Sequence, residues 1–323
     1  MTQKIGKMEE ILIVENISVG NEELEILRDI SFDVKKNEII SIVGESGCGK
    51  SMTLRTIIRL LPKNLKILNG DIIFEGMKLK DLKEKEMNRI RGKKIGMIFQ
   101  EPSSYLNPLF TIGNQIEEAI EGNIKKREKK EMVIKILKEM GLPITTYYQY
   151  PHQLSGGMQQ RAMIAIALIN GPSLLLADEP TTALDVTTAF SIINLLKNLV
   201  TNHNLSILFV THDISLANHI SDRIIVMYGG TIVEIGKSKE IYENPLHPYT
   251  KKLIECLPQR YKKGERIKTI EGEVPFFKNL PAGCPFSQRC DYKMKICEEQ
   301  KPGKIFFENR IVKCFKYGNI VES

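Results

Sequence analysis

The sequence contains no apolar run that approaches the about 20 residues needed by a membrane-spanning helix. The longest such run in the middle of the chain is Ala162–Ile169. The N-terminus carries Lys4 and Lys7 and lacks the apolar centre of a secretion signal. We therefore expect a cytoplasmic protein that reaches a membrane only through its partners.

The chain also lacks an aromatic-rich basic motif, an internal repeat and a low-complexity linker. Its net charge of +7 invites a nucleic-acid interpretation, but Lys and Glu alternate through residues 81–91 and 125–138, as on solvated helix faces. We therefore expect no nucleic-acid partner. With 323 residues and 42% hydrophobic content, the chain can bury a large core, and we expect one principal domain plus a smaller unit.

A phosphate-binding loop is present at residues 44–51, where the sequence matches G-x-x-x-x-G-K-[ST]. An apolar, β-branched run precedes the loop, and residues 52–60 predict a helix after it. Lys50 would reach the β- and γ-phosphates and Ser51 would face Mg²⁺, while Cys48 is either a small filler or an exposed thiol. The expected nucleotide contacts are Gly44, Glu45, Ser46, Gly47, Cys48, Gly49, Lys50, Ser51 and Met52.

Two further apolar strands end in polar residues. Asp178 and Glu179 follow Leu174–Ala177, and His212 follows the strand predicted at 205–210. Strand carboxyl ends face the ligand crevice of a parallel sheet. Asp178 would complete the Mg²⁺ shell, Glu179 would polarise an attacking water, and His212 would contact the γ-phosphate. The alternative for the acids is a solvated strand end.

A second anion cradle follows at Leu154–Arg161, where Ser155 reads as a helix cap and Gly156 and Gly157 allow close approach of the backbone. A helix N-terminus there would present N–H groups to an anion. Because the chain already has a phosphate loop, this second cradle needs a separate explanation.

Together these residues resemble the ATP-binding subunit of an ABC transporter over about residues 10–240. The resemblance implies that Gln100 links metal and water to the membrane partner, that Asp185 lies in the D-loop at 182–185, and that His212 is the switch histidine. It implies Lys50, Glu179 and His212 as catalytic residues and Ser51, Gln100 and Asp178 around Mg²⁺. In the family, the signature motif of one cassette completes the phosphate site of the opposite cassette. The residues that would serve ATP on another subunit are Leu154, Ser155, Gly156, Gly157, Met158 and Gln159.

The implied fold is α/β: a P-loop nucleotide-binding domain with a RecA-like parallel core, an antiparallel β layer and a helical insert, followed by a small Cys-rich extension. We expect the nucleotide-binding domain at 1–240, with its insert at about 101–172, and the extension at 241–323. The alternation over Ile11–Val34 suggests the antiparallel layer, and residues 39–100 would begin the parallel core.

One departure concerns the adenine base. The family usually stacks adenine on an aromatic residue of an early strand, whereas no aromatic residue occurs between Val14 and Ile30. Val19, Asn21 and Ile26 are the remaining candidates to flank the base, with affinity left to the triphosphate contacts.

The segments beyond residue 240 resemble the dipeptide/oligopeptide branch of ABC importers, chiefly through residues 244–250 (Asn-Pro-Leu-His-Pro-Tyr-Thr) and 280–284 (Leu-Pro-Ala-Gly-Cys). Their composition alone indicates only loops and turns. The resemblance implies a peripheral protein on the cytoplasmic membrane face, with a second ATPase subunit that we expect to be a different chain, two permease subunits and, indirectly, an extracellular solute-binding protein. Alternatives are an importer of nickel or another small solute, and a non-transport ATPase acting on nucleic acid or ribosomes.

Four cysteines gather in this tail: Cys284, Cys290, Cys297 and Cys314, with five, six and sixteen residues between them. Structural disulfides are not expected in a cytoplasmic protein, so the cluster suggests a metal. The tight C-x2-4-C pairs of structural zinc are missing, and longer arms suit a larger cubane. Zinc and unligated thiols stay open, and the resemblance implies a [4Fe–4S] cluster.

Overall fold

The computed structural model describes residues 10–182, 184–262 and 264–318 of the chain. These residues form two compact units, each made of several chain segments. Of the described residues, the first unit contains 10–11, 35–38 and those within 81–209, and the second contains 12–34, 39–80 and those within 210–318. The predicted domain boundary at residue 240 stays a prediction.

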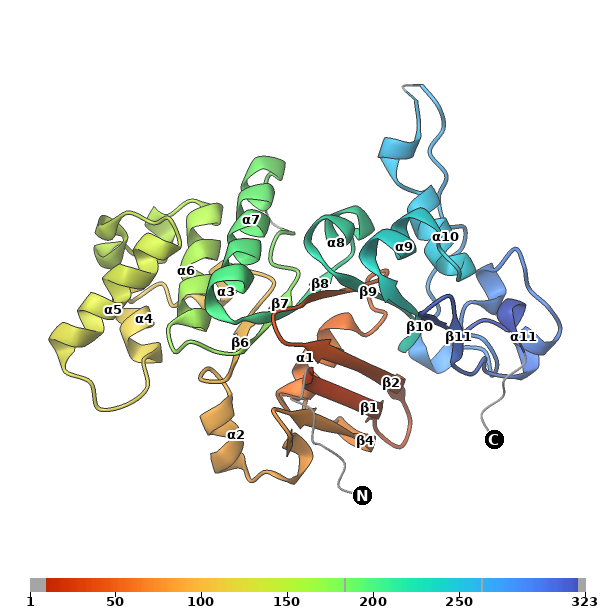
Figure 1. Cartoon of the computed structure of the whole chain (residues 1–323), viewed down its shortest axis with the longest axis horizontal. Coiled ribbons are helices and arrows are strands. Elements are labelled where there is room, and N and C mark those ends of the chain that lie inside the picture. The colour runs from red at the N-terminus through yellow and green to blue at the C-terminus, as the bar shows by residue number, and fades with distance from the viewer. Residues whose placement is uncertain (1–9, 183, 263, 319–323) are drawn as a thin grey trace, which may run out of the picture. The chain divides into compact units, whose positions relative to one another are not determined.

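The first unit combines parallel strands with a group of helices (Figure 1). Its strands are β6 (Ile95–Ile98), β7 (Leu174–Asp178) and the first four residues of β8 (Ser206–Thr211), in the order β8-β7-β6. Strands β6 and β7 are parallel, with Ile98 opposite Ala177. Its helices are α2 (Glu84–Ile90), α3 (Pro102–Tyr105), α4 (Ile112–Ala119), α5 (Lys126–Glu139), α6 (Gly156–Leu168) and α7 (Val186–His203). Helices α3 to α6 occupy the segment predicted as a helical insert.

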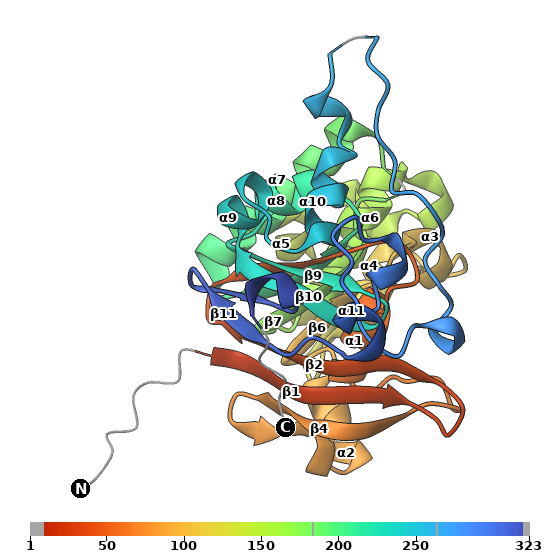
Figure 2. The same ribbon diagram turned by 90° about the vertical axis from the view of Figure 1, so that its right-hand side faces the viewer.

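The second unit holds an antiparallel sheet with the order β2-β1-β4-β5, whose strands lie side by side in Figure 2. A second group of strands has the order β11-β12-β10-β9-β3, in which β3 and β9 are parallel. The strands are β1 (Glu10–Gly20), β2 (Glu25–Lys35), β3 (Ile39–Val43), β4 (Lys66–Phe74), β5 (Met77–Lys78), β9 (Arg223–Tyr228), β10 (Thr231–Lys237), β11 (Ile305–Phe307) and β12 (Arg310–Val312). The helices are α1 (Lys50–Ile57), α8 (Ile214–Ile220), α9 (Ser238–Glu243), α10 (Pro248–Glu255) and α11 (Ile296–Glu299).

The expectation that residues 39–100 begin the parallel core is wrong for residues 66–78. Strands β4 and β5 belong to the antiparallel sheet, where β4 pairs with β1 and β5. Glu75 and Gly76 both have positive φ angles, 47° and 77°, and form the two-residue turn between β4 and β5. A turn of this kind requires an antiparallel hairpin, so the segment cannot continue a parallel core.

The tail contains more regular structure than its Pro-rich composition indicates. Pro248 begins α10, where its missing N–H costs no helical hydrogen bond. The buried His247 caps this helix, because its Nδ1 accepts a hydrogen bond from the Tyr249 N–H at 3.1 Å. A segment that reads as a turn is therefore a helix start.

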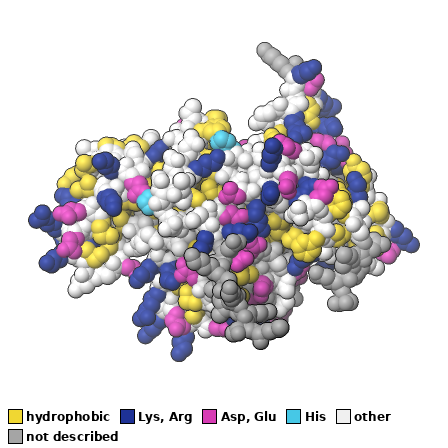
Figure 3. Space-filling model, viewed as in Figure 1, with side chains coloured by type: hydrophobic (Ala, Val, Ile, Leu, Met, Phe, Trp, Pro, Cys, Tyr) yellow, Lys and Arg dark blue, Asp and Glu magenta, His cyan; other side chains and the backbone are white. Residues whose placement is uncertain are grey.

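Charged side chains of both signs are interleaved on the face shown in Figure 3, including those on α5. On that helix Arg127 and Glu131 form an exposed ion pair at 3.1 Å. This pattern matches the predicted solvated helix face. Within the described ranges no helix has both the length and the apolar character needed to span a membrane.

Candidate active site

The phosphate loop lies between the fully buried strand β3 and the N-terminus of α1. Gly47 and Gly49 have φ angles of 78° and 105°, which residues with a Cβ rarely adopt. Gly44 is needed for another reason, since a Cβ there would lie 2.3 Å from the Met227 carbonyl oxygen. The three glycines thus let the backbone wrap tightly where a phosphate would bind.

Lys50 folds back onto its own loop. Its Nζ donates to the carbonyl oxygens of Gly44 at 2.9 Å and Glu45 at 3.1 Å. Lys50 is 4% exposed, so its ammonium group is buried against the loop.

Cys48 is fully buried. Burial raises the pKa of its thiol to about 11, so the thiol is protonated near neutral pH. The interpretation as a small filler is confirmed, and the alternative of an exposed, modifiable thiol is wrong.

Two tail residues that the sequence analysis did not assign contact the phosphate loop. The Arg289 guanidinium forms a bidentate ion pair with the Glu45 carboxylate, at 2.8 and 3.1 Å. The Tyr249 hydroxyl accepts a hydrogen bond from the Glu45 N–H at 2.8 Å. Because 244 and 204 residues separate these partners, no local sequence signal could have revealed the contacts.

The first unit brings Gln100 and Glu179 together. Since Ile98 lies opposite Ala177 in the parallel pair β6–β7, the residues two positions further on are also neighbours. Gln100 Nε2 donates to Glu179 Oε2 at 3.3 Å, and Thr182 Oγ1 donates to the same oxygen at 2.9 Å. Glu179 has a φ angle of 44°, a strained conformation for a non-glycine residue that is common at functional sites. Asp178, next to it, is 4% exposed at the end of β7.

The signature segment opens helix α6 in the first unit. Ser155 is its N-cap and accepts a hydrogen bond from the Met158 N–H at 3.4 Å. Gln159 Nε2 donates to the Pro151 carbonyl at 2.9 Å and ties the helix start to the loop before it. Gly156 is exposed, whereas a Cβ on Gly157 would lie 2.5 Å from Thr188 Cγ2. The helix start is therefore capped and open to a ligand at Gly156.

Asp185 caps the next helix, α7. It accepts hydrogen bonds from the Thr187 hydroxyl and, at 3.0 Å, from the Thr188 N–H. These bonds, that of Thr187 first, hold the pKa of the Asp185 carboxyl well below its usual range. Ala183, in the same predicted D-loop, lies outside the described residues.

The predicted catalytic residues are distributed over both units. Gln100, Asp178, Glu179 and the signature segment belong to the first unit. The phosphate loop and His212, which follows β8 directly, belong to the second. The structure thus describes two sets of site residues, each ordered within its own unit.

Of the candidates to flank adenine, Val19 is fully buried in β1, so its side chain is not available to a base. Asn21 instead closes the β1–β2 turn, because its Oδ1 accepts hydrogen bonds from the N–H groups of Glu23 and Leu24 at 3.0 and 2.9 Å. Ile26 is half-buried.

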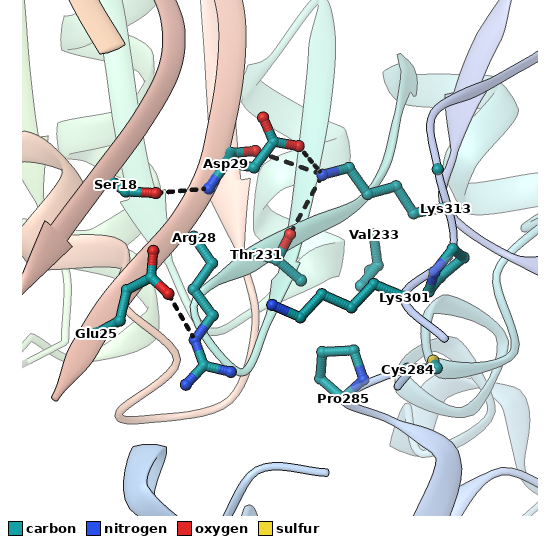
Figure 4. A pocket seen from close by; sticks show the side chains of 12 residues that line it. Ser18, Glu25, Arg28, Asp29, Thr231, Val233, Cys284, Pro285, Lys301 and Lys313 are labelled. Carbon is teal, nitrogen blue, oxygen red and sulfur yellow. Dashed lines mark hydrogen bonds and ion pairs between the residues drawn. The ribbon is translucent and has the colours of Figure 1, made fainter. Parts of the chain in front are cut away.

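A cavity of about 260 Å³ lies within the second unit, next to the first tail cysteine (Figure 4). On one side Lys313 Nζ donates to Asp29 Oδ2 at 2.6 Å, and on the other Cys284 and Pro285 line the wall. The cations of this wall are thus held largely in ion pairs with neighbouring acids, as Arg28 is with Glu25 at 3.8 Å.

The four tail cysteines are free thiols. Burial raises the pKa of Cys284 to about 12, and the other three cysteines act in the same direction. Metal ligation requires thiolates, and no group of three or more His, Cys, Asp or Glu side chains in the described ranges lies close enough to hold a metal ion. The prediction of a [4Fe–4S] cluster, like that of zinc, therefore receives no support from the structure.

Comparison with known proteins agrees with this geometry. The ABC transporter family model matches residues 27–182, and the model of the oligopeptide/dipeptide transporter C-terminal region matches residues 233–297. The dipeptide transport ATP-binding protein DppD of Bacillus subtilis is 41% identical over 318 residues, 95% of either chain. The oligopeptide transport ATP-binding protein OppD of the same organism is 44% identical over 286 residues, 87% of this chain and 80% of OppD.

Among solved structures, the dimeric post-hydrolysis ATP-binding cassette MJ0796, bound to ADP and Pi, is 34% identical with a TM-score of 0.63. The match covers 70% of this chain and 98% of that cassette. A relative of more than 40% identity along nearly the whole chain shows the family, and the matched C-terminal region shows the branch. The chain therefore belongs to the ATP-binding proteins of ABC transporters, in the oligopeptide/dipeptide group.

Proposed function

We propose that this chain is the ATP-hydrolysing subunit that energises import of dipeptides or oligopeptides through a membrane ABC transporter. The observation that carries the proposal is the combination, in one chain, of a match to the ABC transporter family model and a match to the C-terminal region of oligopeptide/dipeptide transporters. DppD and OppD, which this chain resembles over most of its length, are named for dipeptide and oligopeptide transport.

In the proposed reaction, the phosphate-loop amides and Lys50 bind the triphosphate. Ser51, Asp178 and Gln100 would hold Mg²⁺, which would supply positive charge to stabilise the transferred phosphoryl group. Glu179 orients and polarises the attacking water, and the hydrogen bonds from Gln100 and Thr182 hold its carboxylate in place. His212 stabilises charge on the γ-phosphate.

ATP would bind between two cassettes. The capped helix start at Ser155, with Gly156 exposed, is an N–H cradle that the chain's own phosphate loop does not need. We propose that it completes the phosphate site of a second ATPase subunit, a related but different chain. Closure of the two cassettes on ATP and reopening after hydrolysis would then drive the transport cycle.

The same proposal assigns two membrane permease subunits as partners. After Gln100, within the first unit, three apolar residues that lie close together in the sequence are exposed. They are Tyr105, Leu109 and Phe110, of which Leu109 is 79% exposed. Clustered exposed apolar residues mark interaction sites. Because they directly follow the Gln100 segment, we propose that they contact a permease loop and couple it to the nucleotide site. The chain would then lie on the cytoplasmic membrane face. A solute-binding protein would act on the opposite side of the membrane.

An iron–sulfur cluster at Cys284, Cys290, Cys297 and Cys314 remains a proposal. It is supported only by the spacing of the four cysteines in the sequence, whose long arms suit a cubane. It requires a rearrangement that brings at least three sulfurs to ligand distance. Zinc without acid-labile sulfide in the native protein would overturn it.

The experiment that tests the proposed function is anaerobic purification of the native complex, followed by identification of its subunits and analysis of iron and sulfide. We expect a second ATPase subunit and two permeases. Ribosomal or DNA partners in place of permeases would refute the transport function. Because peptide and nickel importers of this branch share most motifs, the partner must distinguish them. A nickel-specific binding protein in the complex would favour the nickel importer.

A further inference from the structure

The contact between Arg289 and Glu45 joins the Cys-rich tail to the nucleotide-binding loop inside the second unit. Both guanidinium nitrogens that face Glu45 donate to its carboxylate, which is the strongest geometry available to such a pair. The Arg289 side chain is 5% exposed, compared with 26% for Glu45. The pair is therefore shielded from water on the arginine side and open on the side of the loop.

Arg289 is itself rigidly held. Besides the two bonds to Glu45, it donates to the carbonyl oxygens of Glu271 at 2.9 Å and Ile270 at 3.2 Å, and to the Tyr228 hydroxyl at 3.3 Å. Five hydrogen bonds match the five N–H donors of a guanidinium. Because Arg289 is held by tail carbonyl groups, a movement of the tail would change its contact with Glu45 of the loop.

Tyr249 makes a second contact with the same loop residue. Its hydroxyl accepts the Glu45 N–H, and its ring packs against Tyr228 and Phe286, with centroids at 4.7 and 5.3 Å. Tyr249 is fully buried. The main chain and the side chain of Glu45 are thus both held by residues that follow the nucleotide-binding core in sequence.

The negative charge of Glu45 explains why these contacts matter for nucleotide binding. An acid at the second position of a phosphate loop repels the triphosphate that the loop must bind. The bidentate ion pair neutralises this carboxylate and fixes its direction. The Glu45 carbonyl also accepts from Lys50 Nζ, so a displaced Glu45 would move the catalytic lysine as well.

We propose that Arg289 and Tyr249 are positioning residues for the phosphate loop, so that ATP affinity depends on the folded Cys-rich tail. This inference rests on the proposed function, since it concerns the same nucleotide. Arg289 directly precedes Cys290, and the Cys284 N–H donates to the Cys297 carbonyl at 2.8 Å. A disturbance of the cysteine segment would therefore withdraw the guanidinium from the loop. By linkage, bound ATP stabilises the tail by the same free energy.

The test compares Arg289→Lys with Arg310→Lys. Arg310 is a matched control, because it is a tail arginine, 3% exposed, that donates to Glu308 at 2.8 Å and lies 3.8 Å from Glu234. For Arg289→Lys, we expect the KM for ATP to rise about 10-fold with little change in kcat, since a lysine cannot make the bidentate pair. Arg310→Lys should lower Tm without changing the KM.

A double-mutant cycle with Glu45→Gln separates positioning from general damage. Once the carboxylate is gone, Arg289→Lys should raise the KM less than about 3-fold, because the two residues act as one unit. Tyr249→Phe removes only the hydroxyl group. It should raise the KM for ATP while the Arg289–Glu45 ion pair stays intact. Equal effects of Arg289→Lys in both backgrounds would overturn the inference.

Hydrogen exchange of residues 44–51 provides a readout that does not depend on turnover. Exchange should be faster in Arg289→Lys than in Arg310→Lys, with or without ATP. If exchange of residues 44–51 were the same in Arg289→Lys as in Arg310→Lys, the positioning role would be refuted, even though the wild-type chain binds ATP. Failure of the wild-type chain to bind ATP would instead refute the proposed function, while loop exchange would still decide the role of Arg289.

Discussion

Gly156→Ala separates the folding role of the signature segment from its role in binding a phosphate. A Cβ at Gly156 would meet only Leu184 Cδ2, at 3.6 Å, which is an ordinary van der Waals contact. The residue is exposed, and its φ angle is not positive. The substitution should therefore be neutral or raise stability by about 0.5–1 kcal/mol, through the smaller entropy of the unfolded chain.

Turnover should respond in the opposite direction. If the N–H groups of this helix start approach a γ-phosphate on a second cassette, an added methyl group at Gly156 prevents the close approach. A displacement of about 1 Å costs about 100-fold in rate. We therefore expect Gly156→Ala to keep or raise Tm while ATP hydrolysis by the assembled transporter falls by about two orders of magnitude.

Gly157→Ala is the informative comparison. Its Cβ would lie 2.5 Å from Thr188 Cγ2, so the variant should lose about 1–3 kcal/mol through overpacking. Thr188→Ser removes the obstructing methyl and should restore Tm in the double variant. Calorimetry and a phosphate-release assay measure both properties. Wild-type turnover in a stably folded Gly156→Ala protein would refute the assignment of the cradle to a phosphate.

The remaining predictions concern catalysis, acid stability and thiol reactivity. Glu179→Gln should bind ATP, accumulate closed dimers and lose turnover; ATPase activity near that of the wild type would disprove the assigned role. Burial lowers the pKa of His247 from 6.5 to about 3. Between these pH values the imidazole binds a proton in the unfolded chain but not in the folded one, so the free energy of unfolding falls as the pH drops below 6.5. Denaturant unfolding should therefore give a free energy of unfolding that is about 2 kcal/mol lower at pH 5 than at pH 8 because of this residue. His247→Asn, which keeps a helix-capping side chain but has no imidazole, should abolish this contribution to the pH dependence. Cys48 should resist iodoacetamide in the folded chain and react after unfolding, as mass spectrometry can establish; rapid labelling of the native protein would show that the loop opens.

Local patterns in the sequence were sufficient to predict the phosphate loop, the acidic strand end and the signature helix. Each depends on residues that are close in sequence, such as the glycines with positive φ at 47 and 49 or the Ser155 cap. The pairing of Gln100 with Glu179 was accessible only in outline, because it follows from the register of two parallel strands. A sequence pattern predicts that strands are present without stating which residues lie opposite each other.

The contacts of the tail could not be predicted. Arg289 and Glu45 are 244 positions apart, and neither occurs in a pattern that requires the other. The assignment of residues 66–78 failed because a strand pattern does not state to which sheet the strand belongs, and the hairpin turn at Glu75 and Gly76 decides it. The cysteine spacing suggested a metal, whereas Cys284 and Cys297 are buried, Cys290 and Cys314 are partly buried, and no triad lies at ligand distance among the residues placed by the structure.

The central claim is that ATP hydrolysis by this chain drives peptide import. The direct measurement is uptake of labelled dipeptides and oligopeptides, and in parallel of nickel, into proteoliposomes that contain this chain with its permeases, second ATPase subunit and solute-binding protein. We predict ATP-dependent peptide uptake that Glu179→Gln abolishes. Nickel uptake without peptide uptake, or peptide uptake that persists in Glu179→Gln, would contradict the account.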